Sequence, residues 1–214
     1  KQTTMKKLFI SMLAIAALAS CAKEETLVAD QGELIGFNSF VENSTRAAVD
    51  PSYGANGAAL TEFQVWGTVN GGNGLVSIFN GADVEGTVGA SNIWHCDVKQ
   101  YWIKDALYNF AAVANAGTVT LGTDLLPKTV TYTANQTDLV YAKSAQYTGK
   151  ASGNDLVAFT FQHLLSKVNF TVVNGSQSAT GYSFQVRDIK IAGASAGTCD
   201  VTTTPAVTWT ATAN

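Results

Sequence analysis

The stretch that most constrains the fold of this chain is Val157–Val173, which reads VAFTFQHLLSKVNFTVV. Apolar residues alternate with smaller or polar ones over Val157–Phe161, as in a strand with one buried face. The apolar positions then change phase by one residue and alternate again over Val168–Val172. Because neighbouring side chains of a strand point to opposite faces, one regular strand cannot hold both phases. We therefore predict two core strands joined by a bulge or a tight corner at His163–Lys167.

The rest of the chain predicts an all-β fold built from short strands. The sequence of 214 residues contains 19 Gly and only 3 Pro, and Gly/Asn clusters separate its apolar runs. The expected strands are Leu34–Phe40, Phe63–Val69, Leu75–Phe79, Val84–Val88, Leu107–Val113, Thr129–Ala134, Tyr182–Val186, Asp188–Ala192 and Val201–Thr212, with another that begins at Thr137–Tyr141 and a turn at Gly193–Gly197. Strands at this spacing favour a β-sandwich. The formal net charge is −3 and no basic patch is visible, which argues against nucleic-acid binding.

The N-terminal residues 1–20 are expected to form a signal peptide. The first methionine is Met5, so Lys1–Thr4 are expected to be upstream or non-native residues. Two lysines precede the apolar run Leu8–Leu18, which is shorter than the roughly 20 residues that a membrane-spanning helix needs. A basic segment followed by a short apolar run is typical of a secretory signal.

The signal ends in a sequence that looks like the lipobox of bacterial lipoproteins. Leu18-Ala19-Ser20 leads directly into Cys21, whose thiol would be acylated after cleavage just before it. Several acyl chains together hold a protein stably on a membrane. The following Lys23-Glu24-Glu25 resembles the signal that sends some Gram-negative lipoproteins to the outer face of the outer membrane, although a solvated tether is the simpler interpretation.

Arg46 is the one arginine before Arg187, and it follows a polar, turn-rich segment. An arginine in an exposed linker is accessible to an Arg-specific protease, but it is also an ordinary solvated residue. From the residues alone both interpretations stay open.

Several short motifs, taken in order, resemble the fimbrillin family of type V pilus subunits and related surface lipoproteins of Gram-negative bacteria. They are the lipobox at Cys21, Thr45-Arg46-Ala47, Phe63–Gly67, Tyr101-Trp102, Tyr108–Ala112, Thr137–Ala142 and, most specifically, Phe159–Phe170. Each motif is weak alone, and their order over nearly the whole chain carries the resemblance.

The resemblance implies a transthyretin-like β-sandwich with Greek-key-type connections and no catalytic activity or cofactor. It also implies that an Arg-specific protease cuts after Arg46 and releases Leu34–Phe40. The groove exposed in this way would take a donor strand from another fimbrillin subunit, by main-chain pairing and by apolar side chains that fill its pockets. The protein would then belong to the cell outer membrane or to a surface pilus.

The same resemblance suggests the domain boundaries. Residues 21–46 would be the lipidated tether with its removable first strand, and residues 47–214 the N-terminal sandwich domain. The family pattern continues into a second sandwich domain, whereas this sequence stops at Asn214. We therefore expect that the second domain is missing and that this chain accepts a strand more readily than it donates one.

Candidate catalytic and metal-binding motifs are weak in this sequence. Gly193–Gly197 matches G-x-S-x-G, but β-type sequence follows it and no histidine lies beyond His163, so we interpret it as a turn. His95-Cys96-Asp97 cannot converge on one metal ion, because adjacent residues of a strand point to opposite faces. We expect no metal site, and for His163 we expect a hydrogen bond to the backbone at the corner.

The thiols and the aromatic residues leave two questions open. Cys96 and Cys199 remain once Cys21 is acylated, and in an oxidising compartment they are candidates for a disulfide, which the sequence alone does not decide.

The alternative function is a surface lipoprotein that binds glycan or a host protein. It would use an exposed platform of aromatic residues, namely Trp66, Trp94, Tyr101 and Trp102.

Overall fold

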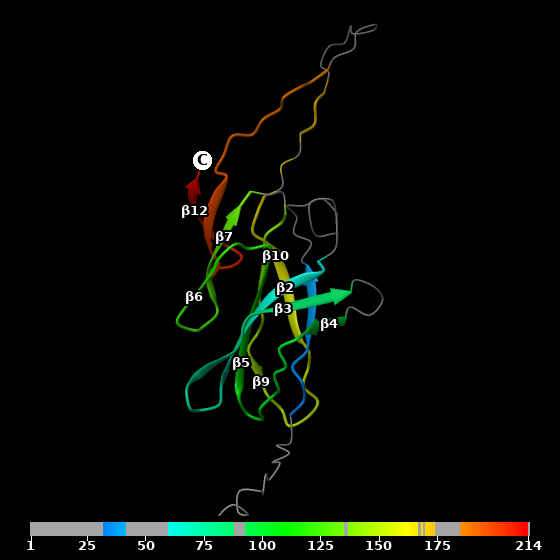
Figure 1. The fold of residues 1–214 in the computed structure, drawn as a ribbon, viewed down its shortest axis with the longest axis vertical. Coiled ribbons are helices and arrows are strands. Elements are labelled where there is room, and N and C mark those ends of the chain that lie inside the picture. The colour runs from blue at the N-terminus through cyan, green and yellow to red at the C-terminus, as the bar shows by residue number, and fades with distance from the viewer. Residues whose placement is uncertain are drawn as a thin grey trace, which may run out of the picture. The chain divides into compact units, whose positions relative to one another are not determined.

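The structure is a computed structural model that describes residues 32–41, 60–87, 93–134, 137–166, 168, 170–173 and 185–213. Within these ranges the chain forms strands and no helix (Figure 1). The strands are β1 Phe37–Val41, β2 Glu62–Asn70, β3 Leu75–Thr87, β4 Ile93–Cys96, β5 Leu107–Ala114, β6 Val119–Leu121, β7 Pro127–Thr133, β8 Val140–Lys143, β9 Tyr147–Thr148, β10 Val157–His163, β11 Ala196–Asp200 and β12 Thr208–Ala213.

The strands form two sheets, and the larger one curls. Its order is β1-β10-β8-β5-β2-β3-β4, with β9 paired to β5. Although β1 and β4 stand at opposite ends of this order, they contact each other. The smaller sheet has the order β12-β11-β7-β6. This arrangement confirms the predicted all-β, sandwich-like fold.

An aromatic core fills the inside of the curled sheet. Its centre is formed by Phe63 of β2, Phe110 of β5 and Phe159 of β10, all of them buried. The rings of Phe63 and Phe159 meet edge to face with their centroids 5.7 Å apart. Such pairs add about 0.5–1.5 kcal/mol beyond the burial of their area, so these contacts stabilise the curled sheet.

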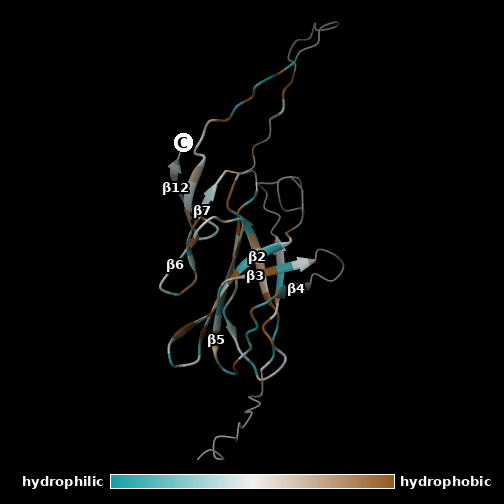
Figure 2. Ribbon diagram, in the orientation of Figure 1, coloured by the Kyte–Doolittle hydropathy of each residue, from teal (hydrophilic) through white to brown (hydrophobic). Residues whose placement is uncertain are grey.

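A second core lies between the two sheets. The large sheet contributes Trp66 and Tyr141 from its outer face, and the small sheet contributes Val130 and Cys199. The period of two along each strand explains how one sheet supplies both cores. On β5, for example, Phe110 faces the aromatic core while Ala111 faces the small sheet. Figure 2 shows residues of contrasting hydropathy following one another along these strands.

β10 confirms the first half of the predicted pattern. Val157, Phe159 and Phe161 are fully buried in the aromatic core. The strand ends at His163, and the amide of Leu164 donates a hydrogen bond to the Leu139 carbonyl (2.9 Å). The chain therefore leaves the large sheet at the predicted corner.

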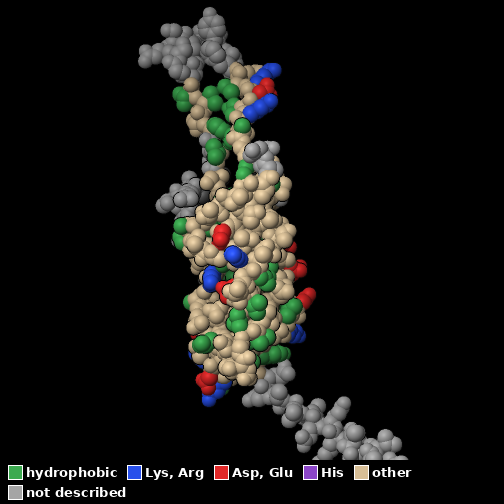
Figure 3. Space-filling view, turned by 90° about the vertical axis from the view of Figure 1, so that its left-hand side faces the viewer, with side chains coloured by type: hydrophobic (Ala, Val, Ile, Leu, Met, Phe, Trp, Pro, Cys, Tyr) green, Lys and Arg blue, Asp and Glu red, His purple; other side chains and the backbone are tan. Residues whose placement is uncertain are grey.

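The second half of the pattern was predicted wrongly. Residues 170–173 form no strand, and Phe170 is 56% exposed. Residues 185–194, which include the expected strand Asp188–Ala192, form none either. The two segments leave the sandwich at the same end (Figure 1), and hydrophobic side chains gather on the part of the molecule that extends there (Figure 3). Alternation shows which side chains share a face, but a strand also needs a partner for its backbone groups, and the described residues of these segments belong to neither sheet.

Two smaller expectations also need correction. Leu75–Phe79 and the residues from Val84 belong to one strand, β3, which runs through Asn80-Gly81 without a turn. Register shifts in its pairing with β2 absorb the irregularity there. Ala196 and Gly197, expected in a turn, begin β11.

Candidate functional site

The most unusual pairing in the fold is that of β1 with β10. Among the described strands it is the one parallel pair, with Phe37 opposite Val157 and Val41 opposite Phe161. β1 ends the strand order and has no second neighbour within a named strand. An edge strand leaves half of its backbone groups unpaired, so it can depart without breaking a ladder on both sides.

The residues just before β1 join the two ends of the curled sheet. The amide of Ile35 donates to the carbonyl of Gln100 (2.9 Å), and the amide of Trp102 donates to the carbonyl of Glu33 (2.9 Å). One residue later the Gly36 carbonyl accepts from the Val157 amide of β10 (2.8 Å). The segment thus pairs first with the residues after β4 and then with β10. Residues 33–41 therefore close the aromatic core.

Phe37 anchors this closing segment. It is only 4% exposed, and its ring stacks on Phe159 with the centroids 5.9 Å apart. It also meets Phe79 at 5.5 Å and Phe110 at 6.4 Å in edge-to-face contacts. Removal of β1 would therefore open a groove lined by aromatic rings along β10. Sequence reasoning identified Leu34–Phe40 as a strand but missed this role of Phe37, since alternation does not reveal which residue fills a core.

A polar clasp holds the beginning of the segment. The Glu33 carboxylate accepts hydrogen bonds from the backbone amide of Asn154 (2.6 Å) and from its side-chain amide (3.1 Å). These bonds favour the charged carboxylate and lower the pKa of Glu33. The clasp links residue 33 to the loop that leads into β10.

Near its start, β10 has a different partner on the side away from β1. The amide of Ala158 donates to the hydroxyl of Tyr147 (2.9 Å), whereas pairing with β8 occurs only at Gln162 and His163. This side of β10 is therefore occupied at Ala158 and at Gln162–His163. On its other side β10 pairs with the edge strand β1.

The corner histidine has an acidic partner. We expected His163 to bond to the backbone, but its Nδ1 contacts the carboxylate of Asp138. The contact ties the end of β10 to the residues before β8.

Both cysteines in the part of the chain that the structure describes are free. Cys96 lies on β4 and packs against the aromatic core, whereas Cys199 lies on β11 in the second core. The candidate disulfide between them is thus not formed here. Burial raises the pKa of both thiols, that of Cys199 to about 11. Both groups are therefore protonated at neutral pH.

The aromatic platform expected for ligand binding is not formed. Trp66 and Trp102 are only 5% and 4% exposed, and they belong to different cores. Trp94 packs against Phe63, with ring centroids 4.9 Å apart. Of the four residues only Tyr101 is exposed. The alternation of the sequence did not distinguish rim from core for these rings.

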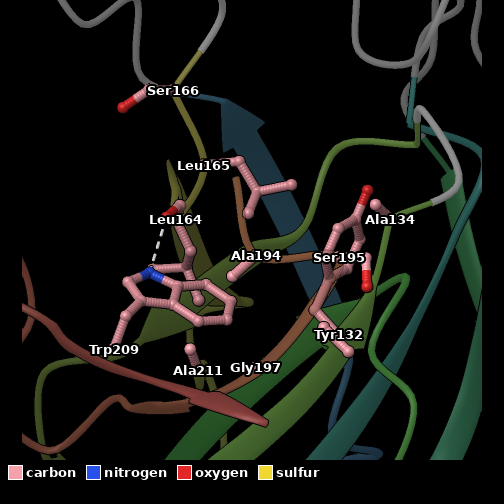
Figure 4. Close-up of a pocket in the computed structure, with 11 residues that line it drawn as sticks. Tyr132, Ala134, Leu164, Leu165, Ser166, Ala194, Ser195, Gly197, Trp209 and Ala211 are labelled. Carbon is pink, nitrogen blue, oxygen red and sulfur yellow. Dashed lines mark hydrogen bonds between the residues drawn. The ribbon is translucent and has the colours of Figure 1, made fainter. Parts of the chain in front are cut away.

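The candidate nucleophile Ser195 borders a cavity of about 420 Å³ (Figure 4). Trp209, whose indole nitrogen donates to the Leu164 carbonyl (3.1 Å), and Tyr132 stand on opposite sides of it. The described residues that line it include no carboxylate, histidine, cysteine or basic side chain. Ser195 leads into β11, without the helix that a nucleophile elbow has after its serine.

The predicted lipidation and cleavage residues, Cys21 and Arg46, lie outside the described residues. Among the residues that are described, no group of three or more potential metal ligands occurs. The described part of the chain also contains no helix that is long and apolar enough to cross a membrane.

The molecule is an all-β, sandwich-like domain, and its first strand pairs in parallel at the edge of the larger sheet. A family model described as fimbrillin-like matches residues 45–214, and the chain belongs to this family of structural pilus subunits, which are generally not enzymes. No curated protein matches the chain, and no solved structure does.

Proposed function

We propose that this chain is a non-catalytic, lipid-anchored subunit or accessory component of a cell-surface pilus, assembled by strand exchange after proteolysis. In this proposal an Arg-specific protease cuts after Arg46 and so severs the covalent link between β1 and the rest of the sandwich. A strand from a neighbouring subunit then pairs with β10 in its place. The single observation that carries the proposal is the position of β1, which closes the aromatic core from a sheet edge.

The order of features along the chain supports this mechanism. Arg46 follows shortly after the last residue of β1, Val41, and is preceded by Asn43-Ser44. A cut there separates β1 from the sandwich without removing any residue of β2–β12. The cut alone leaves Phe37 in its pocket, so β1 must still be displaced. An incoming strand that offers the same hydrogen bonds and an equivalent side chain would lower the cost of that displacement.

The membrane part of the proposal rests on the sequence around Cys21. Acylation of this thiol would anchor the subunit to the outer membrane, and Lys23-Glu24-Glu25 would direct it to the cell surface. A surface location would bring Arg46 to an extracellular protease and to the other fimbrillin subunits. The pilus would then be assembled outside the cell.

The test of strand exchange uses a chain that can be cut at one arginine. Because Arg187 lies in an exposed segment and is the other arginine of the chain, the substitution Arg187→Lys restricts an Arg-specific protease to Arg46. The cut chain is mixed with a full-length fimbrillin-like subunit, and unheated samples are examined by SDS gel electrophoresis. We expect SDS-resistant oligomers.

The matched control carries Arg46→Lys in addition, so that the protease cannot cut. This control should stay monomeric under the same conditions. If the cut chain gives only monomers, or if the uncut control forms the same oligomers, cleavage does not trigger assembly and the proposed mechanism fails.

A further inference from the structure

Phe37 gives the groove along β10 a preference for an aromatic side chain. Four phenylalanine rings surround it, at centroid distances between 5.5 and 6.5 Å, and they belong to β2, β3, β5 and β10. A smaller side chain at this position would leave a cavity inside a rigid aromatic core. The cost of such a cavity depends on how far the walls relax, and Phe→Ala changes in cores typically cost about 3–5 kcal/mol.

Ile35 fixes a second position, two residues before the anchor. It is only 4% exposed and belongs to the same core, and its amide is bound to the Gln100 carbonyl. Leu34, between the clasp and Ile35, is 49% exposed, and its side chain therefore contributes little to recognition. The groove thus selects an aliphatic residue at position 35 and accepts any residue at position 34.

Glu33 fixes a third position, at the start of the segment. Its carboxylate accepts from the backbone N–H of Asn154 and from its side-chain Nδ2, which also donates to the Lys150 carbonyl (3.0 Å). When the segment leaves, the backbone N–H loses this acceptor and the side-chain amide keeps one of its two. A carboxylate accepts hydrogen bonds but cannot donate them, so it matches a site that presents two N–H groups. The site therefore favours an acidic residue four positions before the aromatic anchor.

Gly36 imposes a weaker preference. A Cβ atom at this position would lie 2.6 Å from Cδ2 of Leu156, which is too close. The Leu156 side chain is exposed and can turn away, however, so a larger residue displaces one flexible side chain and leaves the backbone in place. We therefore do not expect this position to decide which strand binds.

We propose that the vacated groove selects its donor strand by the pattern acidic–x–aliphatic–x–aromatic, at the positions now held by Glu33, Ile35 and Phe37. The donor runs parallel to β10, with its first residues paired to Gln100–Trp102. The inference rests on the proposed strand exchange and adds to it the chemistry of the partner. It commits to an extended peptide segment as the occupant.

The test measures binding of labelled peptides to the chain after cleavage at Arg46 in the Arg187→Lys background. The cut chain is unfolded in urea to release β1 and is freed of the small fragment. It is then refolded with a peptide of the sequence from Glu33 to Val41, and binding is followed by fluorescence anisotropy. The Phe37→Ala peptide should bind more than about 100-fold more weakly. The Glu33→Gln peptide should bind more weakly by a smaller factor, and the Leu34→Ala peptide should bind like the original.

The possible results separate this inference from the proposed function. If all peptides bind equally well, strand replacement stands and the selectivity is wrong. If the refolded chain binds none of them, both fail. If the cut chain does not refold, hydrogen exchange of the Val157 amide in the uncut chain tests the inference instead. Phe37→Ala must accelerate this exchange and Leu34→Ala must not, and equal rates in the two variants would overturn the inference.

Discussion

At the scale of single residues, the closing segment depends on one anchor. Among the side chains that the structure describes in residues 33–38, Phe37 is the largest buried one, and it belongs to an edge strand with half of its backbone groups unpaired. The buried side chains therefore hold the segment together with its main-chain hydrogen bonds to Gln100, Trp102 and Val157. This makes Phe37 the residue whose loss should most strongly mimic the departure of β1.

We expect Phe37→Ala to lower the free energy of unfolding of the uncut chain by about 3–5 kcal/mol. Leu34→Ala is the matched control, because the exposed Leu34 side chain should contribute less than about 0.5 kcal/mol. Urea denaturation followed by circular dichroism measures both values. Similar small losses for the two variants would show that β1 contributes little to the core.

The raised pKa values of the two cysteines predict slow thiol reactions. In a Cys21→Ser variant at pH 8, Cys199 should react with a disulfide reagent far more slowly in the folded chain than in urea, because the reactive thiolate is disfavoured by burial and by Asp200. Half-buried Cys96 should react sooner. Rapid reaction of both thiols in the folded chain would contradict this burial.

The raised pKa of Cys199 makes the free energy of unfolding depend on pH in the alkaline range. A pKa of about 11 in the folded state exceeds the ordinary thiol value of about 8.5, so between these values the folded chain binds more protons than the unfolded one. The free energy of unfolding should therefore fall as the pH rises from about 8.5 to 11. In denaturation experiments at several pH values, a Cys199→Ala variant should lose part of this dependence. If the slope of the unfolding free energy against pH is unchanged in the variant, the dependence does not come from Cys199.

At the scale of elements, the curled sheet is built by alternation and by close approaches of its central strands. Gly67 of β2 is one such approach. A Cβ atom there would come within 2.8 Å of the rings of both Phe79 and Phe110. The central strand therefore passes close to the aromatic core because it has no side chain at this position.

Gly67→Ala should destabilise the chain by about 1–3 kcal/mol, since an added methyl group must displace two buried rings. Gly71→Ala is the control, because nothing lies within 4 Å of the corresponding Cβ position. Thermal denaturation of the two variants distinguishes them. Equal melting temperatures would mean that the rings can move aside at little cost.

Alternation predicted several elements well and others poorly, for physical reasons. It located β2, β5 and β10, whose one-sided or continuous apolar runs are distinctive. It also predicted strands over Val168–Val172 and Asp188–Ala192, where the pattern is as regular but the described residues pair with no strand. Periodicity is a local property, whereas pairing depends on segments far apart in the chain.

The candidate site was predictable only in outline. Leu34–Phe40 was identified as a strand from its weak alternation, and the family resemblance suggested that it is removable. The parallel pairing with β10, the anchor at Phe37 and the clasp at Glu33 depend on long-range contacts. The aromatic platform was predicted wrongly because large rings such as Trp66 and Trp102 occur both in cores and at rims.

At the scale of the whole molecule, the chain belongs to the fimbrillin-like family, and the proposed mechanism uses both the aromatic core and the strand that closes it. In the proposed mechanism the chain is stored in a self-complemented state and is completed by another subunit after cleavage. The lipid anchor at Cys21 would keep it at the membrane until then.

The anchor makes a separate prediction. Cells that produce the chain should incorporate a labelled fatty acid into it, and Cys21→Ser should abolish the labelling and release the protein from the membrane fraction. Cys96→Ser serves as the control and should change neither result. Labelling that persists in the Cys21→Ser variant would place the lipid elsewhere, and no labelling of the unchanged chain would exclude the anchor.

The central claim is that the edge of β10 exchanges one strand for another, and hydrogen exchange of the Val157 amide tests it most directly. This amide donates to Gly36 in the uncut chain (2.8 Å). We expect this amide to be protected before cleavage, exposed once β1 has been removed, and protected again in the complex with a full-length subunit. An amide that stays protected after β1 has gone, or one that stays exposed in the assembled complex, would contradict the account.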